Sequence, residues 1–577
     1  MRILGLVGAT HDSGIAILDD GKIDVVIEEE RLRRQKRTQD FPVLSLKAAL
    51  GADGAGFKDI DALVTPWDGR RLRRSFSKAV FGKLPASLSL LAQSTHTPQR
   101  NQFAILEHYL KRKLRRHFPN VRLPQLINVG HHEAHAASFF VSPYERAAVL
   151  VMDGYGDDAA TSVFSGDGNR LERHWRSSFF NSLGMVYTFT TGYLGFEQVA
   201  DEGKVMALAA LGDDSYVARF GDCVKLLPEG RYAVNMDYFS FDAYGQWRPM
   251  KRKFFDVFGA PRDPGAPIED RHKAIAFALQ HVAEETILHI VRHIVRTQQT
   301  DKLVFAGGVA LNCVANARIL ELTSVKQLWV PPGASDTGAP LGACLWHYHQ
   351  TLRHPRSLEL KSASYGLAYS DAEINQALSD AGLEAETLSE EDLLRRVARD
   401  LAGGAVIGWF QGRFEMGPRA LGNRSILADP RKAAMRDEIN SKIKHRESFR
   451  PFAPAILRER VSEYFFVDPA QADPFMTLAP CVRPEKAREI PAAVHADGTG
   501  RIQTVEREAN PRFYRLIEAF AAETGVPVLL NTSFNRQEPI VASPKEAVSC
   551  YLRTNMDALA LGLRYVAPGR RPPTPTR

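Results

Sequence analysis

Cysteine is scarce in this chain, and long apolar runs are missing. Only five cysteines occur among 577 residues, and no two of them form a CxxC pair, so the sequence indicates neither a zinc knuckle nor a disulfide framework. No apolar run approaches the ~18 residues that span a bilayer, and the N-terminus enters a strand pattern without the basic and apolar segments of a signal peptide. We therefore expect a cytoplasmic protein that is not inserted in a membrane.

The composition is that of a soluble globular protein. Hydrophobic residues make up 44% of the chain and charged residues 24%, and the length corresponds to three or four domain-sized units. The net charge of +7 would suit nucleic acid, but Lys and Arg are not gathered with aromatic residues in a recognisable RNA-binding module. A small anionic substrate explains the charge as well, and we do not expect nucleic acid as a partner.

A pattern of strand, glycine turn and strand occurs twice. The strands lie at residues 3–7, 15–18 and 23–27 and again at 147–152 and 161–164, with turns at 8–14, 20–21, 153–157 and 166–168. The glycine turns of two facing hairpins can present backbone N–H groups to phosphates. The repetition therefore predicts an α/β domain similar to the duplicated ATPase fold of actin and the sugar kinases.

Helix and strand patterns continue along the rest of the chain. Residues 270–298 have apolar side chains at helical spacing and predict a long amphipathic helix. Further strands are expected at 303–306, 327–330, 405–410 and 526–530, and further helices at 431–444 and 513–524. The predicted domains are residues 1–350, a linker at 351–366, a second α/β domain at 367–568 and a proline-rich flexible tail at 569–577.

Two histidines have the spacing of a metal-binding pair. His131 and His135 are four residues apart, so on a helix both rings point to one side. Taken alone, such histidines more often cap or pack. Asp153, in the second glycine turn, and Asp336, in Ser-Asp-Thr-Gly, could complete a shell of two nitrogen and two carboxylate ligands. Such a shell suits Fe(II), Mn or Zn, and we expect His132 to be a bystander.

His11 and Asp12 lie in the first glycine turn. A histidine there can remove a proton from a hydroxyl, because its ordinary pKa lies near neutrality. The alternative is a turn histidine in solvent. The residues alone favour that alternative, and only a family resemblance changes the balance.

Candidate nucleotide contacts lie in and after the second copy of the pattern. Gly154 belongs to its turn, and Gly307 and Gly308 open a helix near Asn312, where N-terminal N–H groups can meet a nucleotide. Lys204, in Glu-Gly-Lys-Val-Met, could reach a phosphate. A surface turn with an extended lysine is its plainer interpretation.

The second region has the sequences that favour anion binding most strongly. Residues 412–425 place three arginines, including Arg419, in a turn-rich loop, and residues 442–452 add Lys444 and Arg450. A run of charges is usually a solvated face. Here Pro and Gly restrict the backbone near Arg419, and Arg450 lies between two phenylalanines, which indicates guanidinium groups held for phosphate. Two further polar candidates are Arg501 and, after a strand, Ser533.

These motifs together resemble the O-carbamoyltransferases, the family that includes the nodulation and tobramycin carbamoyltransferases. The resemblance runs over nearly the whole chain and rests on His-Asp in the first hairpin, His-His-x-x-His-Ala, Glu-Gly-Lys-Val-Met, Gly-Gly-Val-Ala-Leu-Asn-Cys, Ser-Asp-x-Gly, Gly-Pro-Arg-Ala-Leu-Gly-Asn-Arg-Ser, Phe-Arg-Pro-Phe-Ala-Pro and Leu-Asn-Thr-Ser-Phe-Asn. The one difference noted is Ser13, where the family more often has alanine.

The resemblance implies a first domain like the tRNA threonylcarbamoyladenosine transferase and a second, YrdC-like domain. In that family, carbamoyl phosphate and ATP give carbamoyl-adenylate in the second domain, and a hydroxyl attacks this intermediate in the first. The implied cofactors are ATP, Mg²⁺ and Fe²⁺ or another transition metal. The implied partners are carbamoyl phosphate and a small-molecule or glycan acceptor such as a secondary metabolite or lipo-oligosaccharide, and a homodimer is possible.

The resemblance also assigns roles to individual residues. The implied set is His11 with Asp12 for catalysis, His131, His135, Asp153 and Asp336 for the metal, Gly154, Lys204, Gly307, Gly308 and Asn312 for the nucleotide, and Arg419, Lys444, Arg450, Arg501 and Ser533 for carbamoyl phosphate and ATP.

Two other hypotheses compete with this one. A kinase of the actin and sugar-kinase fold would explain both hairpins, but neither the histidine pair nor the second region. A non-enzymatic scaffold for RNA or tRNA modification would suit the basic charge. The sequence does not identify the acceptor, because specificity lies in surface loops.

Overall fold

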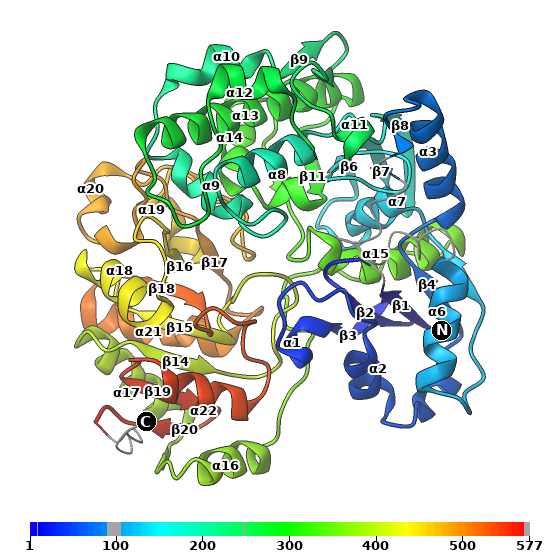
Figure 1. The fold of residues 1–577 in the computed structure, drawn as a ribbon. Coiled ribbons are helices and arrows are strands. Elements are labelled where there is room, and N and C mark those ends of the chain that lie inside the picture. The colour runs from blue at the N-terminus through cyan, green and yellow to red at the C-terminus, as the bar shows by residue number, and fades with distance from the viewer. Residues whose placement is uncertain (9, 89, 91–105, 246–247, 570–577) are drawn as a thin grey trace. The chain divides into compact units, whose positions relative to one another are not determined.

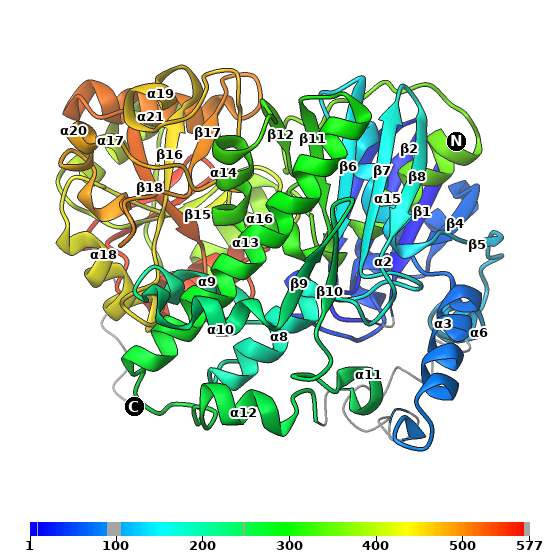
Figure 2. The same ribbon diagram turned by 90° about the horizontal axis from the view of Figure 1, so that it is seen from above.

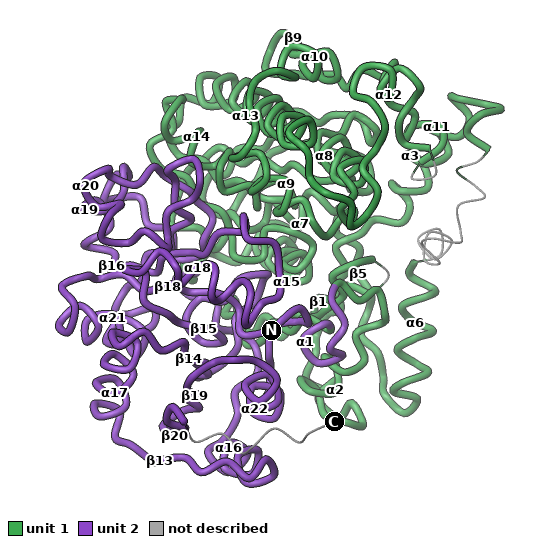
Figure 3. Tube along the Cα trace, turned by 60° about the vertical axis from the view of Figure 1, so that its left-hand side comes forward, with its two compact units in different colours: residues 1–29, 37–359 green, residues 30–36, 360–577 purple. Residues whose placement is uncertain are grey.

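The computed structural model describes residues 1–8, 10–88, 90, 106–245 and 248–569. The chain forms two compact units (Figure 3), one of residues 1–29 with 37–359 and one of residues 30–36 with those from 360 onward. The division thus falls inside the predicted linker, between Glu359 and Leu360. The predicted tail, apart from Gly569, and Ala9 of the first turn lie outside the described residues.

The first sheet of unit 1 begins with an antiparallel meander and continues with parallel strands (Figure 1). Its order is β3-β2-β1-β4-β5, with β1 (Arg2–Val7), β2 (Gly14–Asp19), β3 (Lys22–Glu28), β4 (Ala62–Thr65) and β5 (Leu126–Asn128). Strands β1 to β3 pair antiparallel, and β4 and β5 are parallel to β1. Strand β1 has buried residues on both of its faces, because helices cover the sheet.

The second sheet of unit 1 repeats this topology. Its order is β8-β7-β6-β11-β12, with β6 (Arg146–Met152), β7 (Thr161–Asp167), β8 (Arg170–Arg176), β11 (Lys302–Ala306) and β12 (Gln327–Trp329). Again the first three strands form an antiparallel meander and the last two are parallel to the first. The duplicated α/β fold predicted from the two hairpins is confirmed.

Two short helices form the layer between the sheets. Helix α7 (His131–Ala136) packs on β6 and β7, helix α15 (Ala339–Leu345) packs on β1, β2 and β4, and the two helices pack on each other. The other helices and strands of unit 1 are α2 (Val43–Leu50), α3 (Gly69–Gly82), α6 (Leu106–His117), α8 (Leu183–Tyr193), α9 (Glu202–Ala209), α10 (Val217–Gly221), β9 (Val224–Leu227), β10 (Arg231–Val234), α11 (Phe241–Tyr244), α12 (Arg252–Phe258) and α14 (Cys313–Leu322).

The long amphipathic helix is confirmed as α13 (Asp270–Gln298), which runs beside the second sheet in Figure 2. It packs on β6, α8, α9 and α14. Among the described residues it is also the one helix whose length and apolarity would suit a membrane span. Most of its apolar stretch, 72%, is buried inside the fold.

Unit 2 is built on a mixed sheet of eight strands. The order is β13-β20-β19-β14-β15-β18-β16-β17, with β13 (Glu386–Thr387), β14 (Ile407–Phe410), β15 (Arg424–Ala428), β16 (Ala453–Leu457), β17 (Gln503–Val505), β18 (Val528–Ser533), β19 (Ala558–Leu561) and β20 (Arg564–Val566). Helices α17 (Glu390–Ala402) and α21 (Pro511–Thr524) pack together on this sheet and enclose the core with Trp409. Its remaining helices are α16 (Asp371–Asp380), α18 (Ala434–Glu438), α19 (Val461–Tyr464), α20 (Pro484–Ala487) and α22 (Pro544–Arg553). The predicted α/β class is confirmed for both units.

Four predicted boundaries are wrong. The strand expected at 526–530 is β18, which begins at Val528 and ends at Ser533. The turn expected at 166–168 lies later, because β7 continues to Asp167 and Gly168 takes the positive φ. The strand expected from 405 begins at Ile407. The helix expected at 431–444 starts only at Ala434, since Asp429 accepts the backbone N–H of Arg431 in a turn, and it continues as a π-helix over Ile439–Lys444.

A short segment from the first part of the chain belongs to unit 2. The segment is residues 30–36, which includes all of helix α1 (Glu29–Arg33) except its first residue and packs with the second unit. The buried guanidinium of Arg31 donates to the carbonyl oxygens of Glu415 and Gly417, and Arg34 donates to those of Pro539 and Ile540. Sequence periodicity did not reveal this exchange.

We predict that Gly5→Ala destabilises unit 1. A methyl group on Gly5 of β1 would lie 2.1 Å from the carbonyl oxygen of Pro340, at the start of α15. Overpacking of this kind costs about 1–3 kcal/mol or more. Gly221→Ala is the matched control, because a methyl group there meets no atom within 4 Å. Urea unfolding followed by circular dichroism measures both variants, and equal midpoints would contradict the close approach.

Candidate functional site

The four residues predicted to bind a metal come together in unit 1. His131 and His135 lie one turn apart on α7, Asp153 directly follows β6, and Asp336 begins a 3₁₀ turn, Asp336–Gly338, that leads into α15. One ligand atom from each residue lies within 4.8 Å of all the others. The duplicated fold therefore places side chains from three separate elements at one point.

The distances in this cluster match those of a coordination shell. The Nε2 atom of His131 is 3.3 Å from Asp153 Oδ2 and 3.3 Å from Asp336 Oδ1. His135 Nε2 is 3.1 Å and 3.5 Å from the same oxygens, and the two Nε2 atoms are 3.1 Å apart. Ligands about 2.1 Å from a tetrahedral ion lie about 3.4 Å from one another. The geometry and the donor set thus fit a transition metal such as Fe(II), Mn or Zn.

The electrostatics of the cluster favour a cation. Burial alone would lower the pKa of His131 and His135, but Asp336 and Asp153 raise both. Burial would raise the pKa of the two carboxyl groups, and the two imidazoles hold both below the ordinary value. Protons on the imidazoles would therefore balance the carboxylates of Asp336, which is buried, and Asp153, which is half-buried. A divalent cation would supply the same balancing charge, and its binding would release protons.

Residues outside the cluster orient His131. Its Nδ1 lies 3.2 Å from the carbonyl oxygen of Pro66, which favours a proton on Nδ1 and directs Nε2 toward the carboxylates. The Trp67 ring stacks on the imidazole with 3.9 Å between centroids. Asp157 accepts the backbone N–H groups of His131 and Asp68, each at 3.2 Å. Sequence analysis missed these residues, because only tertiary structure brings residues 66–68 to α7.

His132 lies apart from the cluster. Its Nδ1 atom is 2.8 Å from the Ser162 hydroxyl, and the ring lies against Gly156. Burial keeps its pKa well below the ordinary value. The ring faces the second sheet, so it is not among the residues that could hold the metal ion.

His11 and Asp12 lie at the tip of the first hairpin, near the cluster. Their Nδ1 and Oδ2 atoms are 3.2 Å apart, and Asp12 has a positive φ of 61°. Burial opposes protonation of His11, but Asp12, then Asp336, raise its pKa to about 10. The charge of Asp336 reaches His11, so the first hairpin tip and the metal ligands occupy one site. A cation held by Asp336 would lower the pKa of His11 again.

The glycines predicted to bind the nucleotide also lie beside the cluster. Gly307 directly follows β11 with a φ of 90°, and a methyl group there would lie 2.2 Å from the Met152 carbonyl oxygen. A methyl group on Gly308 would lie 3.0 Å from Asp153 Oδ1, and one on Gly154 would meet only Met185. Strands β6 and β11 are parallel neighbours, so these turns meet at their carboxyl ends, where α/β sheets bind ligands.

The other two candidate nucleotide contacts have protein partners. Lys204 lies in α9 instead of the alternative surface turn, and its ammonium group is 3.0 Å from Asp201. The side chain of Asn312 caps α14 through the Ala315 N–H and exchanges hydrogen bonds with Gln280. A nucleotide contact from either side chain would therefore use its remaining hydrogen-bonding capacity.

In unit 2, Lys444 and Ser533 are in direct contact. The buried ammonium group of Lys444 donates to the Ser533 carbonyl and hydroxyl oxygens and to the carbonyl and side-chain oxygens of Asn535. Burial lowers the pKa of Lys444 well below its ordinary value, and the charges of Arg446, Lys36 and Arg450 lower it further. Lys36, which belongs to the exchanged segment 30–36, is thus an unpredicted member of this group.

Arg446 connects Lys444 with the other predicted cations. Burial and the charges of Arg450 and Arg501 lower the pKa of Arg446 to about 9. Its guanidinium stacks on Phe452, 4.6 Å from the ring centroid. The cation cluster, defined here as Lys36, Lys444, Arg446, Arg450 and Arg501, is a place of high positive potential that suits a phosphate.

The loop of Arg419 is organised around a buried carboxylate. Glu415 accepts the backbone N–H groups of Leu421, Asn423 and Arg424 through one oxygen, and the half-buried Arg419 lies within this loop. The other two arginines are structural. Arg413 donates to the carbonyl oxygens of Tyr365 and Gly366, and Arg424 is fully buried over Phe410 with carbonyl partners.

The comparisons with known proteins concern both units. Residues 2–345 match the family model of the carbamoyltransferase N-terminus, and residues 398–567 match that of the carbamoyltransferase C-terminus. The chain is 40% identical to the uncharacterized protein sll1178 of Synechocystis sp., over 97% of this chain and 95% of that protein. It is 36% identical to nodulation protein NolNO of Sinorhizobium fredii, over 96% and 78%.

Among solved structures, component A of the Acidaminococcus fermentans (R)-2-hydroxyglutaryl-CoA dehydratase covers 61% of this chain and 100% of its own, with 14% identity and a TM-score of 0.33. This likeness is too low to carry an argument. The two family models describe carbamoyltransferases. They therefore favour neither the kinase hypothesis nor the hypothesis of a non-enzymatic scaffold. The chain belongs to the carbamoyltransferase family and is an enzyme that transfers a carbamoyl group.

Proposed function

We propose that the protein is an ATP-dependent O-carbamoyltransferase, which uses carbamoyl phosphate and passes through carbamoyl-adenylate. The final acceptor is a hydroxyl group of a small molecule or glycan. The observation that carries this proposal is the meeting, in unit 1, of the four-ligand cluster with His11 of the first hairpin. This arrangement provides a Lewis-acid site and a titratable group at one point, as acyl transfer to a hydroxyl requires.

Activation is assigned to unit 2. ATP with Mg²⁺, carbamoyl phosphate and water would give carbamoyl-adenylate, pyrophosphate and phosphate. ATP, carbamoyl phosphate, carbamoyl-adenylate, pyrophosphate and phosphate are all anionic, and the positive charge of the cation cluster suits them. Lys444 also holds the backbone at Ser533, the last residue of β18, and at Asn535. Arg450 lies 3.8 Å from a carboxylate oxygen of Glu447.

Transfer is assigned to unit 1. His131, His135, Asp153 and Asp336 would hold the metal ion, which when bound would stabilise negative charge on the phosphate of the intermediate. The glycine turns at Gly154 and Gly307 keep the backbone close to this site, where the Gly154 N–H donates to Asp153 Oδ1 and the Gly307 N–H donates to the Ala334 carbonyl oxygen. His11, oriented by Asp12, would accept the proton of the attacking hydroxyl, AMP would leave, and a carbamate ester would form.

The metal assignment predicts that His131→Ala and Asp336→Ala lose both the metal and transfer. Each variant removes one of four ligands and leaves a buried charge unbalanced. We expect metal content near zero and transfer lowered by about a thousandfold or more, since charge stabilisation by a metal amounts to several kcal/mol. Elemental analysis and product mass spectrometry measure these effects. His108→Ala, which changes an exposed histidine of α6, is the control, and full metal occupancy in both site variants would refute the assignment.

The division of labour predicts that Arg450→Ala separates the two half-reactions. The wild type should release pyrophosphate from ATP and carbamoyl phosphate, and the variant should lose about 99% of this rate, since hydrogen bonds to charged groups contribute about 1.5–3 kcal/mol each. Transfer from synthetic carbamoyl-adenylate should continue. Lys442→Ala is the control, because Lys442 is exposed and pairs with Glu438. Absence of pyrophosphate in the wild type would reject the proposed activation, and loss of both activities in a folded Arg450 variant would reject two separate sites.

The third prediction concerns His11. His11→Asn should keep carbamoyl-adenylate formation and lose about 10²- to 10⁴-fold in transfer. Because the pKa of His11 is raised to about 10, the neutral base is scarce at pH 7, so the wild-type transfer rate should rise with pH. A bound metal ion would end this rise at lower pH without reversing it. Single-turnover transfer from pH 5 to 9 measures both effects. A variant with unchanged rates, or a wild-type rate that falls with pH, would remove His11 as the base.

A further inference from the structure

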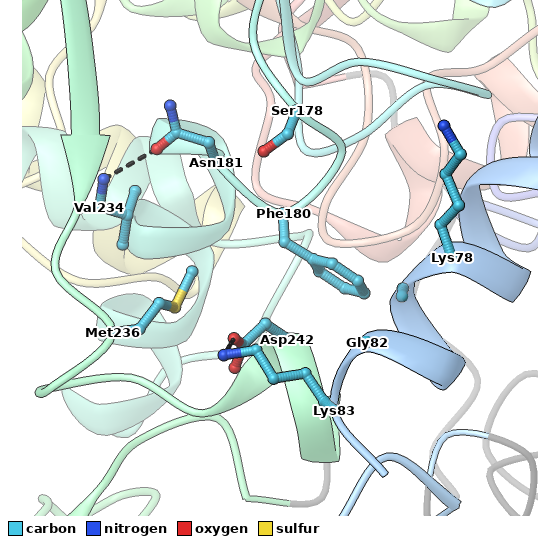
Figure 4. A pocket seen from close by; sticks show the side chains of 10 residues that line it. Lys78, Gly82, Lys83, Ser178, Phe180, Asn181, Val234, Met236 and Asp242 are labelled. Atoms are coloured by element: carbon cyan, nitrogen blue, oxygen red, sulfur yellow. Dashed lines mark hydrogen bonds and ion pairs between the residues drawn. The ribbon is translucent and has the colours of Figure 1, made fainter.

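Unit 1 has a pocket that none of the predicted site residues lines. It lies between the C-terminal part of α3, the loop that follows β8, and the segment after β10, and its volume is about 360 Å³. Figure 4 shows Phe180 in its centre, with Lys78, Gly82 and Lys83 of the α3 side opposite Val234 and Met236. This volume lies at the lower end of the range for small-molecule sites, about 300–1,000 Å³, so it suits one part of a ligand.

The loop of this pocket is attached to the metal cluster. Ser182 donates its hydroxyl to the carbonyl oxygens of Asp153 and Gly154. Its neighbour Asn181 lines the pocket and is fixed on β10, since it donates to the Tyr232 carbonyl and accepts the Val234 N–H, both at 2.8 Å. One residue therefore separates the pocket wall from the backbone of a metal ligand.

Aromatic side chains continue this connection. Phe180 of the pocket packs on Phe179 with 4.9 Å between ring centroids, and Phe179 packs on Tyr155 with 5.1 Å. Tyr155 belongs to the second hairpin turn, two residues after the metal ligand Asp153. An aromatic surface thus leads from the pocket toward the metal cluster.

Helix α3 provides a second connection and a length. Asp68 caps its N-terminus directly after Trp67, which stacks on His131, and Arg71 pairs with Glu133 of α7. Lys78 lies ten residues after Asp68, which is about 15 Å along a helix. A ligand that contacts Lys78 and also reaches the metal cluster must therefore be about this long.

The lining has one positive charge in excess. Lys83 pairs with Asp242 at 3.0 Å, whereas Lys78 forms no ion pair within the described part of the chain. Phe180, Val234 and Met236 provide apolar surface next to it. The chemistry suits a ligand that has one anionic group beside an apolar face.

We infer that this pocket binds the acceptor at a distance from its reacting hydroxyl, and that the acceptor carries an anionic group there. The inference rests on the proposed function, because an acceptor presupposes transfer. Lys78 would bind the acidic group and Phe180 would pack on the apolar face, while the hydroxyl reaches the metal cluster and His11. Specificity for the acceptor would then come from α3 and the loop at residues 178–181.

A matched pair of probes tests the inference. Phenyl β-D-glucuronide and phenyl β-D-glucoside differ in one carboxylate, and their binding to the full chain is measured by ligand-observed NMR titration. We expect the wild type to bind the glucuronide several-fold more tightly, since partly exposed ion pairs contribute modestly. Lys78→Glu should weaken glucuronide binding about five- to tenfold and change glucoside binding less than twofold. Phe180→Ala should weaken both.

Lys47→Glu is the control, because it makes the same charge change at an exposed residue of α2. Equal binding of the two probes, no binding of either, or a glucuronide preference that survives Lys78→Glu would each overturn the pocket. Pyrophosphate release by the same preparations separates this failure from failure of the proposed function. Release without probe discrimination rejects the pocket alone, and discrimination without release rejects its role as an acceptor site.

Discussion

The first unit depends on the contact of two buried imidazoles with one buried carboxylate, Asp336, and one half-buried carboxylate, Asp153. An unpaired buried carboxylate costs several kcal/mol, so Asp153 and Asp336 are tolerable only because His131 and His135 lie within about 3.5 Å of them. These residues come from α7, from the end of β6 and from the turn before α15. Helix α7 packs on α15, and Gly5 lets β1 approach α15 closely. Both contacts therefore help to bring the four ligand atoms together.

The duplication explains why different chemical groups meet at one place. Each sheet has a meander whose first strand ends in a glycine turn, and the two turns occupy equivalent positions in the two copies. One turn has diverged to carry His11 and Asp12, and the other to carry Asp153 and Gly154. The effect of Asp336 on the pKa of His11 requires the first hairpin tip to be close to the metal ligands. Internal symmetry thus supplies proximity, and divergence within it supplies a ligand set and a titratable group.

Local patterns made much of the fold and part of the site predictable. The meanders and α13 follow from apolar periodicity and turn residues, which act over short stretches of chain. The four-ligand cluster could be predicted from the sequence because two ligands share a helix and a third lies in a recognised turn. The roles of Trp67, Asp157 and Lys36 could not be predicted, since long-range packing alone brings these residues to their partners. The stacking of Arg446 on Phe452 and the π-helix that precedes Arg446 depend in the same way on tertiary contacts.

The second unit holds charge in a less balanced way than the first. Burial and neighbouring positive charges lower the pKa of Lys444 and the pKa of Arg446. The positive charge of each residue in the cation cluster therefore disfavours the protonated form of its neighbours. Buried arrangements of like charge oppose folding unless another contribution offsets them, and functional sites are where proteins retain such strain. Asn535 and Ser533 satisfy the ammonium group of Lys444 but bring no negative charge. Glu447, 3.8 Å from Arg450, offsets part of the positive charge, and an anionic ligand such as a phosphate-bearing substrate would offset more of it.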